Sequence, residues 1–167
     1  FPGQGSQKVS MGYDFYQKTE IGKKYFNLAN DIMECDIQDI IFNGPEEKLR
    51  ETLYTQPAIY IVSVIIGKIL LDKGFIPEMV AGHSLGEYSA CTIAGSFSFE
   101  NGLSLVKLRA ENMQLAGKTN PGTMAAIIGM SFNNILDICK SSSKEGSTVV
   151  VANHNSPNQI VISGNTS

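Results

Sequence analysis

Apolar residues recur at helical spacing through the first forty residues. Between residues 13 and 41 they stand three or four positions apart, with breaks, which predicts a succession of amphipathic helices. The apolar positions concerned are Phe15, Tyr25, Phe26, Leu28, Ala29 and Ile32. The stretch "NGPEEKL", residues 43–49, predicts a turn and a new helix, because Pro45 and two acidic residues occupy its first positions.

The most apolar run is "AIYIVSVIIGKILL", residues 58–71. It predicts a long buried helix that begins near Thr55 and ends at Gly74. Lys68 interrupts the run, which is also too short to span a bilayer. We therefore expect a core helix and no membrane partner.

The pattern then changes to that of a strand followed by helices. "EMVAGHS", residues 78–84, predicts a strand that leads directly into a serine, and helical patterns resume over Gly86–Ala94 and Phe99–Leu115. The opening "FPGQGSQ", residues 1–7, predicts a loop of the kind that follows a strand. This order indicates an α/β fold with a parallel sheet.

After "AGKTNPG", residues 116–122, shorter elements follow. Strands are predicted over 123–129, 147–153 and 159–164, with an amphipathic helix over 132–142 after the first strand. The turn-rich "HNSPN" between the last two strands predicts a hairpin. The order β-α-β-β is the first half of a ferredoxin-like unit, whose second half is expected beyond Ser167.

Composition excludes several classes of protein. The chain has 167 residues, 43% of them hydrophobic, and a formal net charge of −3, without the basic surface typical of nucleic-acid binding. Cys35, Cys91 and Cys139 lie far apart with no CxxC pair. They predict buried free thiols in a reducing compartment, with neither a metal site nor a disulfide framework.

The candidate chemistry lies in Gly82-His83-Ser84-Leu85-Gly86, which fits the G-x-S-x-G nucleophile elbow. Glycines two residues before and after the serine allow the sharp turn. The serine then stands at the start of a helix, where unpaired N–H groups and the helix dipole favour developing negative charge. The predicted strand before and helix after Ser84 are the context that this motif requires.

Five segments resemble the malonyl-CoA:acyl carrier protein transacylase family of type II fatty acid synthesis. They are "FPGQGSQ", "GHSLGEYSA", "LRAENMQ", "GTMAAIIG" and "NHNSPNQIVISG", in this order and spacing. The resemblance implies an α/β-hydrolase-like large subdomain over 1–119 and a ferredoxin-like small subdomain over 120–167. Both would be incomplete in this chain.

The resemblance also implies roles for individual residues. Ser84 would take malonyl from coenzyme A and pass it to the phosphopantetheine thiol of acyl carrier protein, with no metal or further cofactor. The backbone N–H groups of Gln4 and Leu85 would form the oxyanion hole. Arg109 would bind the malonyl carboxylate, although its position on a helix by itself predicts a solvated or snorkelling residue.

The base that activates Ser84 is harder to place. His83 adjoins the serine, but neighbouring side chains diverge at an elbow, so it is expected to line the pocket or to form a hydrogen bond. His154 is predicted in a surface turn, and Asn153 and Asn155 either line the acyl pocket or serve as turn residues. In the family the catalytic histidine lies in a later "PxHS" segment. We therefore expect the N-terminal part of an enzyme, inactive without its base.

Three alternatives remain open from the sequence. They are an acyltransferase domain of a polyketide or multifunctional fatty acid synthase, a serine esterase or thioesterase, and a non-catalytic fragment that binds carrier protein. Arg109 and the "FPGQGSQ" loop argue against the esterase. The many isoleucine, lysine and asparagine residues suit an AT-rich genome, which predicts a bacterial-type cytoplasm or an organelle such as a plastid.

Overall fold

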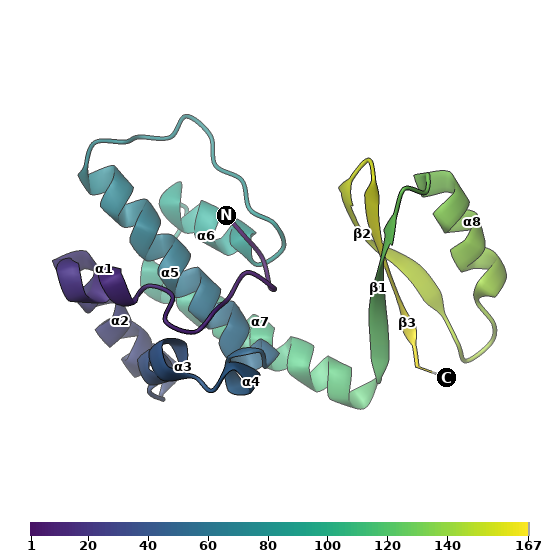
Figure 1. The fold of residues 1–167 in the computed structure, drawn as a ribbon, viewed down its shortest axis with the longest axis horizontal. Coiled ribbons are helices and arrows are strands. Elements are labelled where there is room, and N and C mark those ends of the chain that lie inside the picture. The colour runs from purple at the N-terminus through teal and green to yellow at the C-terminus, as the bar shows by residue number, and fades with distance from the viewer. Residues whose placement is uncertain (167) are drawn as a thin grey trace. The chain divides into compact units, whose positions relative to one another are not determined.

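A computed structural model describes residues 1–166 of the chain (Figure 1). The chain divides into two units, Phe1–Gln114 (unit 1) and Leu115–Ser167 (unit 2), which we describe separately. The range 120–167 predicted for the small subdomain ends at Ser167, which lies outside the described residues. The assignment of the two predicted ranges to named subdomains stays a prediction.

The described part of unit 1 is helical. Its helices are α1 (Tyr13–Lys18), α2 (Glu20–Met33), α3 (Ile37–Asn43), α4 (Glu46–Leu49), α5 (Thr52–Asp72), α6 (Gly86–Ile93) and α7 (Phe99–Thr119), the last of which continues into unit 2. Side chains fix the breaks between the first helices, because Thr19 accepts from Gly22 N at the start of α2 and Asp36 accepts from Asp39 N at the start of α3. The predicted succession of helices is confirmed.

The apolar run forms α5, the central helix of unit 1. It contacts α2, α3, α4 and α6 (Figure 1). By length and composition alone α5 could cross a membrane, but 67% of its most apolar window is buried inside the structure. The predicted core helix is confirmed, and it begins at Thr52, three residues earlier than expected.

Tyr60 connects α5 to α6 and α7 by hydrogen bonds. Its side chain is fully buried, and its hydroxyl lies 2.8 Å from Thr92 Oγ1 and donates to Phe99 O at 3.1 Å. Burial raises the pKa of Tyr60 to about 12 from an ordinary value of 10.0. Between these two values the folded state holds the phenol proton more tightly than the unfolded state does.

Tyr60→Phe is therefore expected to have two effects on stability. At neutral pH the free energy of unfolding should fall by about 1–2 kcal/mol, because the partners of a buried hydroxyl are left unpaired. As the pH rises from about 10 to about 12, the wild type should lose stability more steeply than the variant, which has no phenol there to ionise. Urea unfolding at pH 7 and pH 11 measures both, and a constant difference between the two proteins would refute the pH effect.

The strand predicted over 78–84 does not form, and this part of the sequence prediction is wrong. Residues 75–83 contain no helix or strand, and two backbone hydrogen bonds join this segment to Phe1 on either side of Gly82. Phe1 N donates to Ala81 O (2.7 Å) and His83 N donates to Phe1 O (3.0 Å), which is the pattern of one rung of a parallel ladder. A strand needs a neighbour along its length, and the described part of unit 1 supplies one rung only.

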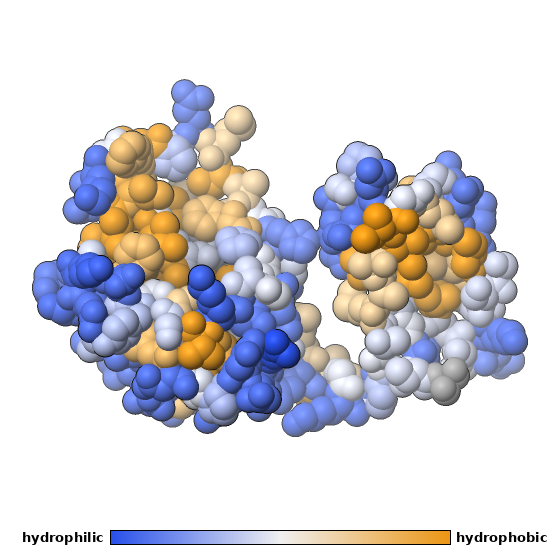
Figure 2. All heavy atoms as spheres, viewed as in Figure 1, coloured by the Kyte–Doolittle hydropathy of each residue, from blue (hydrophilic) through white to orange (hydrophobic). Residues whose placement is uncertain are grey.

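Apolar side chains of this segment reach the surface. Phe75, Ile76 and Met79 are strongly exposed, and apolar surface is visible on both units in Figure 2. The sequence pattern identified an apolar stretch correctly but could not show what the stretch packs against.

Unit 2 contains the sheet. Its elements are β1 (Gly122–Ile128), α8 (Phe132–Ser142), β2 (Val149–Ser156) and β3 (Gln159–Asn165), with strand order β1-β3-β2 and antiparallel pairing throughout. Buried Ile135 and Cys139 of α8 pack with Ile160 of β3. The α/β class and the predicted β-α-β-β order are confirmed. The sheet found is antiparallel, so the parallel sheet and the two named subdomain types stay predictions.

The predicted hairpin joins β2 to β3, but its turn is shorter than expected. Ser156 pairs with Gln159, so the connection is Pro157-Asn158. His154 lies on β2 and its ring stacks on Phe132 with centroids 5.4 Å apart, which corrects its placement in a surface turn. The aromatic contact and the strand pairing outweigh the turn preference of the surrounding residues.

The three cysteines are free, as predicted, but only Cys139 is buried. Cys35 and Cys91 are half-buried, which corrects the expectation that all three thiols lie in the core. A single sequence gives the apolar character of a thiol but not its depth.

Candidate active site

Ser84 stands at a sharp turn directly before α6. Its φ angle of 53° lies in the left-handed region, which a residue with a Cβ adopts only where its surroundings enforce it. Two backbone hydrogen bonds close the turn, from Gly86 N to His83 O (2.9 Å) and from Glu87 N to Ser84 O (3.3 Å). Ser84 is exposed, so its hydroxyl is accessible to a substrate.

The two motif glycines are required by close backbone contacts. A Cβ on Gly82 would lie 1.9 Å from the carbonyl carbon of Gly86 and 2.1 Å from Glu87 N. A Cβ on Gly86 would lie 2.2 Å from Phe1 O. All of these atoms belong to the backbone, so the movement of a side chain could not relieve the overlap. The elbow predicted from the motif therefore has its physical basis in the structure.

The N-terminal loop packs directly on this elbow. Besides the hydrogen bonds of Phe1 on either side of Gly82, a Cβ on Gly3 would lie 2.7 Å from His83 O. The next residue is Gln4, whose side-chain Nε2 donates to Thr52 Oγ1 at the start of α5 (3.3 Å). The loop is thus fixed on one side by the elbow and on the other by α5.

Two backbone N–H groups, one in the elbow and one in the loop that packs on it, are not used by any hydrogen bond among residues 1–166. No hydrogen bond within residues 1–166 uses the N–H of Leu85 or of Gln4, whereas the N–H groups of Gly86, Glu87 and Tyr88 bond back into the turn. The Leu85 side chain is fully buried and anchors the residue. Their predicted role as an oxyanion hole is compatible with these contacts and stays a prediction.

Arg109 reaches Ser84 from α7. Its Nη2 donates to Ser84 Oγ (3.0 Å), its Nη1 donates to Gln56 Oε1 (2.6 Å), and its Cζ lies 5.9 Å from the centre of the Tyr88 ring. Arginine only donates, so Ser84 Oγ accepts and the hydroxyl proton remains free to leave. Arg109 is half-buried and fixed by these contacts, which a solvated or snorkelling residue would not be.

The other predicted site residues are placed as follows. His83 lies in the elbow itself and is exposed, while Asn153 and Asn155 lie on β2 of unit 2, where Asn155 Nδ2 donates to Gln159 Oε1 (3.0 Å). The role of the two asparagines beside an acyl pocket therefore stays a prediction. Among residues 1–166, no group of three or more His, Cys, Asp or Glu side chains is placed to hold a metal ion.

Gln56 was not anticipated from the sequence. It is fully buried and contacts Arg109, 53 positions later in the chain. Its signal was present in the printed sequence, because it is a polar residue two positions before the most apolar run and within the same predicted helix. Such a residue needs a buried partner, but its identity follows only from the fold.

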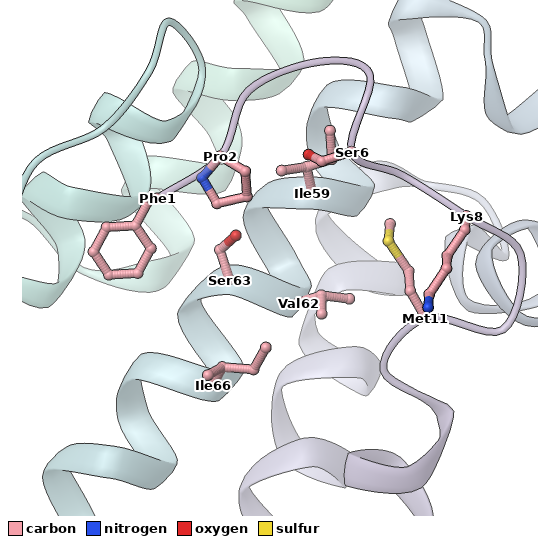
Figure 3. Close-up of a pocket in the computed structure, with 9 residues that line it drawn as sticks. All are labelled: Phe1, Pro2, Ser6, Lys8, Met11, Ile59, Val62, Ser63 and Ile66. Atoms are coloured by element: carbon pink, nitrogen blue, oxygen red, sulfur yellow. The ribbon is translucent and has the colours of Figure 1, made fainter.

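An apolar pocket of about 270 Å³ lies beside the N-terminal loop (Figure 3). Side chains of the loop and of α5 line it: Phe1, Pro2, Ser6, Lys8, Met11, Ile59, Val62, Ser63 and Ile66. Neither Ser84 nor Arg109 is among them. The chemistry of this unit is therefore centred on the elbow and not on this pocket.

Comparison with known families agrees with this geometry. The model of the family described as "Acyl transferase domain" matches residues 1–167. The chain belongs to the acyl transferase domain family. The resemblance seen in the sequence motifs is thereby confirmed.

Relatives of this acyl transferase domain have consistent names. It is 40% identical to the malonyl CoA-acyl carrier protein transacylase of Bacillus subtilis strain 168 over 164 residues, which are 98% of this chain and 52% of the relative. It is 43% identical to the protein of the same name from Synechocystis over 98% of this chain and 53% of the relative. The chain thus spans about half the length of the curated relatives it matches.

Solved structures agree with the sequence relatives. One is a malonyl-transacylase in complex with a type II PKS acyl-carrier protein, with a TM-score of 0.91 and 40% identity over 99% of this chain and 53% of that one. Another is an acyl carrier protein S-malonyltransferase from Vibrio cholerae, with the same TM-score and identity over 99% and 54% of the two chains. The acyl transferase domain therefore shares its fold with these enzymes.

Proposed function

We propose that the natural full-length protein transfers malonyl from coenzyme A to acyl carrier protein, through an ester on Ser84, for fatty acid synthesis. One observation carries the proposal. An exposed serine hydroxyl stands in a left-handed turn at the start of α6 and accepts a hydrogen bond from Arg109. The names of the relatives support malonyl as the acyl group and the carrier protein as its acceptor.

The first half-reaction loads Ser84. Ser84 Oγ attacks the thioester carbonyl carbon of malonyl-CoA while a base takes the hydroxyl proton. The N–H groups of Leu85 and Gln4 stabilise the negative oxygen of the tetrahedral intermediate. The C–S bond then breaks, and the coenzyme A thiolate takes up a proton as it leaves.

The second half-reaction reverses these steps with another thiol. The phosphopantetheine thiol of acyl carrier protein loses its proton and attacks the ester carbonyl, and Ser84 Oγ recovers a proton as the ester bond breaks. No metal or redox group is needed. The residues of this chain bind the acyl group, hold the nucleophile and stabilise the oxyanion.

The family resemblance supports a histidine outside residues 1–167 as the base. His83 is next to Ser84 in the chain, where neighbouring side chains diverge. Residues 1–167 by themselves are accordingly expected to acylate Ser84 very slowly or not at all. The role of His83 is to line the site.

Arg109→Ala is expected to lower kcat/KM for malonyl-CoA by about 10- to 100-fold, because a charged, bidentate partner of the free carboxylate is lost. The value for acetyl-CoA, which has no such carboxylate, should stay equal or rise. Arg109→Lys keeps the charge without the planar fork and should recover only part of the loss. Steady-state transfer to the carrier protein measures each value. Equal losses for the two substrates would contradict the carboxylate role.

A second experiment distinguishes the transfer of malonyl to carrier protein from the hydrolysis of malonyl-CoA. The full-length protein is incubated with malonyl-CoA, with and without carrier protein that bears phosphopantetheine. The proposal expects malonyl on the carrier and little free malonate when the carrier is present. Free malonate produced at the same rate with and without carrier would establish a thioesterase instead.

A further inference from the structure

Gln56 connects two helices through both ends of its amide group. Its Oε1 accepts from Arg109 Nη1 (2.6 Å), and its Nε2 lies 3.2 Å from Met113 Sδ, to which it donates. Arg109 and Met113 are four residues apart and therefore adjacent on one face of α7. The orientation of the amide is determined by chemistry, because the donor-only guanidinium must face its oxygen.

Burial makes this contact strong. Gln56 is fully buried near the start of α5, so no water competes for its oxygen. An apolar replacement would leave one Arg109 N–H without its acceptor and remove a restraint on the guanidinium. Tyr88, 5.9 Å from Arg109 Cζ, restrains the guanidinium only through its ring face and would not replace the lost acceptor.

We infer that Gln56 is a positioning residue that orients the Arg109 guanidinium beside Ser84 without neutralising its charge. The inference rests on the proposed function, in which Arg109 binds the malonyl carboxylate. Each terminal nitrogen of Arg109 carries two N–H bonds, and one from each is committed to Gln56 and Ser84. The second N–H of each nitrogen remains to bind a carboxylate.

The neutrality of Gln56 is part of the inference. A carboxylate in its place would accept the same hydrogen bond but would form a buried ion pair with Arg109. That pair would compete with the malonyl carboxylate for the guanidinium charge. Two substitutions of Gln56 therefore separate the two effects. A leucine removes the restraint on the orientation of the guanidinium, and a glutamate keeps that restraint but neutralises the guanidinium charge.

The experiment compares Gln56→Leu, Gln56→Glu and the matched control Ile59→Val, a buried α5 residue with no polar side-chain atom, in the full-length protein. The first measurement is kcat/KM for malonyl-CoA relative to acetyl-CoA. Gln56→Leu and Gln56→Glu are each expected to reduce this ratio by about tenfold or more, and Ile59→Val to leave it unchanged. In an Arg109→Ala background the Gln56→Leu effect should disappear, because the residue acts through Arg109.

The second measurement does not depend on catalysis. Side-chain ¹⁵N NMR reports rotation about the Cζ–Nη bonds of Arg109, which should be slow in the wild type and in Gln56→Glu, and fast in Gln56→Leu. Slow rotation in Gln56→Leu, or a selectivity ratio equal to that of the wild type, would overturn the inference. A wild-type protein that transfers no malonyl would instead overturn the proposed function, while the rotation rates would still decide whether Gln56 orients Arg109.

Discussion

Ser84→Ala is expected to reduce malonyl transfer to carrier protein by at least about a thousandfold, because the variant has no atom that can form the acyl ester. The turn should persist, since alanine also carries a Cβ and adopts the left-handed conformation at a cost similar to that of serine. The loss should therefore appear in the rate while the unfolding midpoint stays close to that of the wild type.

Ser89→Ala is the matched control for this prediction. Ser89 lies in the same motif segment on α6, is fully buried, and its Oγ has no hydrogen-bond partner among residues 1–166. Removing a hydroxyl without a partner should leave transfer and stability close to those of the wild type. Transfer retained in Ser84→Ala, or lost equally in both variants, would show that the Ser84 hydroxyl is not the nucleophile.

Gly82→Ala is expected to destroy the elbow. Its new Cβ would lie 1.9 Å from the Gly86 carbonyl carbon and 2.1 Å from Glu87 N, so the turn must open. Opening would displace Ser84 from Arg109 and from the start of α6. We expect transfer to fall by at least about a hundredfold, since small displacements of reacting groups already cost this much, and the free energy of unfolding to fall by at least about 2 kcal/mol.

Gly117→Ala is the matched control, because it makes the same glycine-to-alanine change at a position without steric overlap. Gly117 lies in α7, and an added Cβ would meet no atom within 4 Å other than the adjacent residues and the backbone of its own helix. Alanine favours a helix over glycine by up to about 1 kcal/mol, so this variant should be as stable as the wild type or slightly more stable. Transfer rates and chemical unfolding of both variants test the pair. A Gly82→Ala protein with wild-type activity would refute the requirement for the tight turn.

The sequence predicts the turn at Ser84 and most of the secondary structure well, because these features depend on residues that are close together in the chain. The glycines around Ser84, the helical periodicity before residue 41 and the β-α-β-β order of unit 2 all depend on spacing within short segments. Each of these is found in the structure. The family motifs add a role for Arg109 that its position on an amphipathic helix does not indicate.

Contacts between distant segments are what the sequence does not provide. The hydrogen bond from Arg109 to Ser84 spans 25 positions, and the one from Arg109 to Gln56 spans 53. The strand expected before Ser84 failed for the same reason, because hydropathy indicates an apolar segment but does not supply its pairing partner. His154 likewise lies on a strand, since its contact with Phe132 and the hairpin register depend on the fold of the unit.

The covalent role of Ser84 is tested most directly by locating the acyl group. The full-length protein is mixed with malonyl-CoA without carrier protein, digested, and its peptides are sequenced by mass spectrometry. We expect one malonyl group, on Ser84 itself, and we expect it to be released when carrier protein is added before digestion. Malonyl on any other residue, or an unmodified Ser84 in a protein that transfers malonyl, would contradict this covalent role.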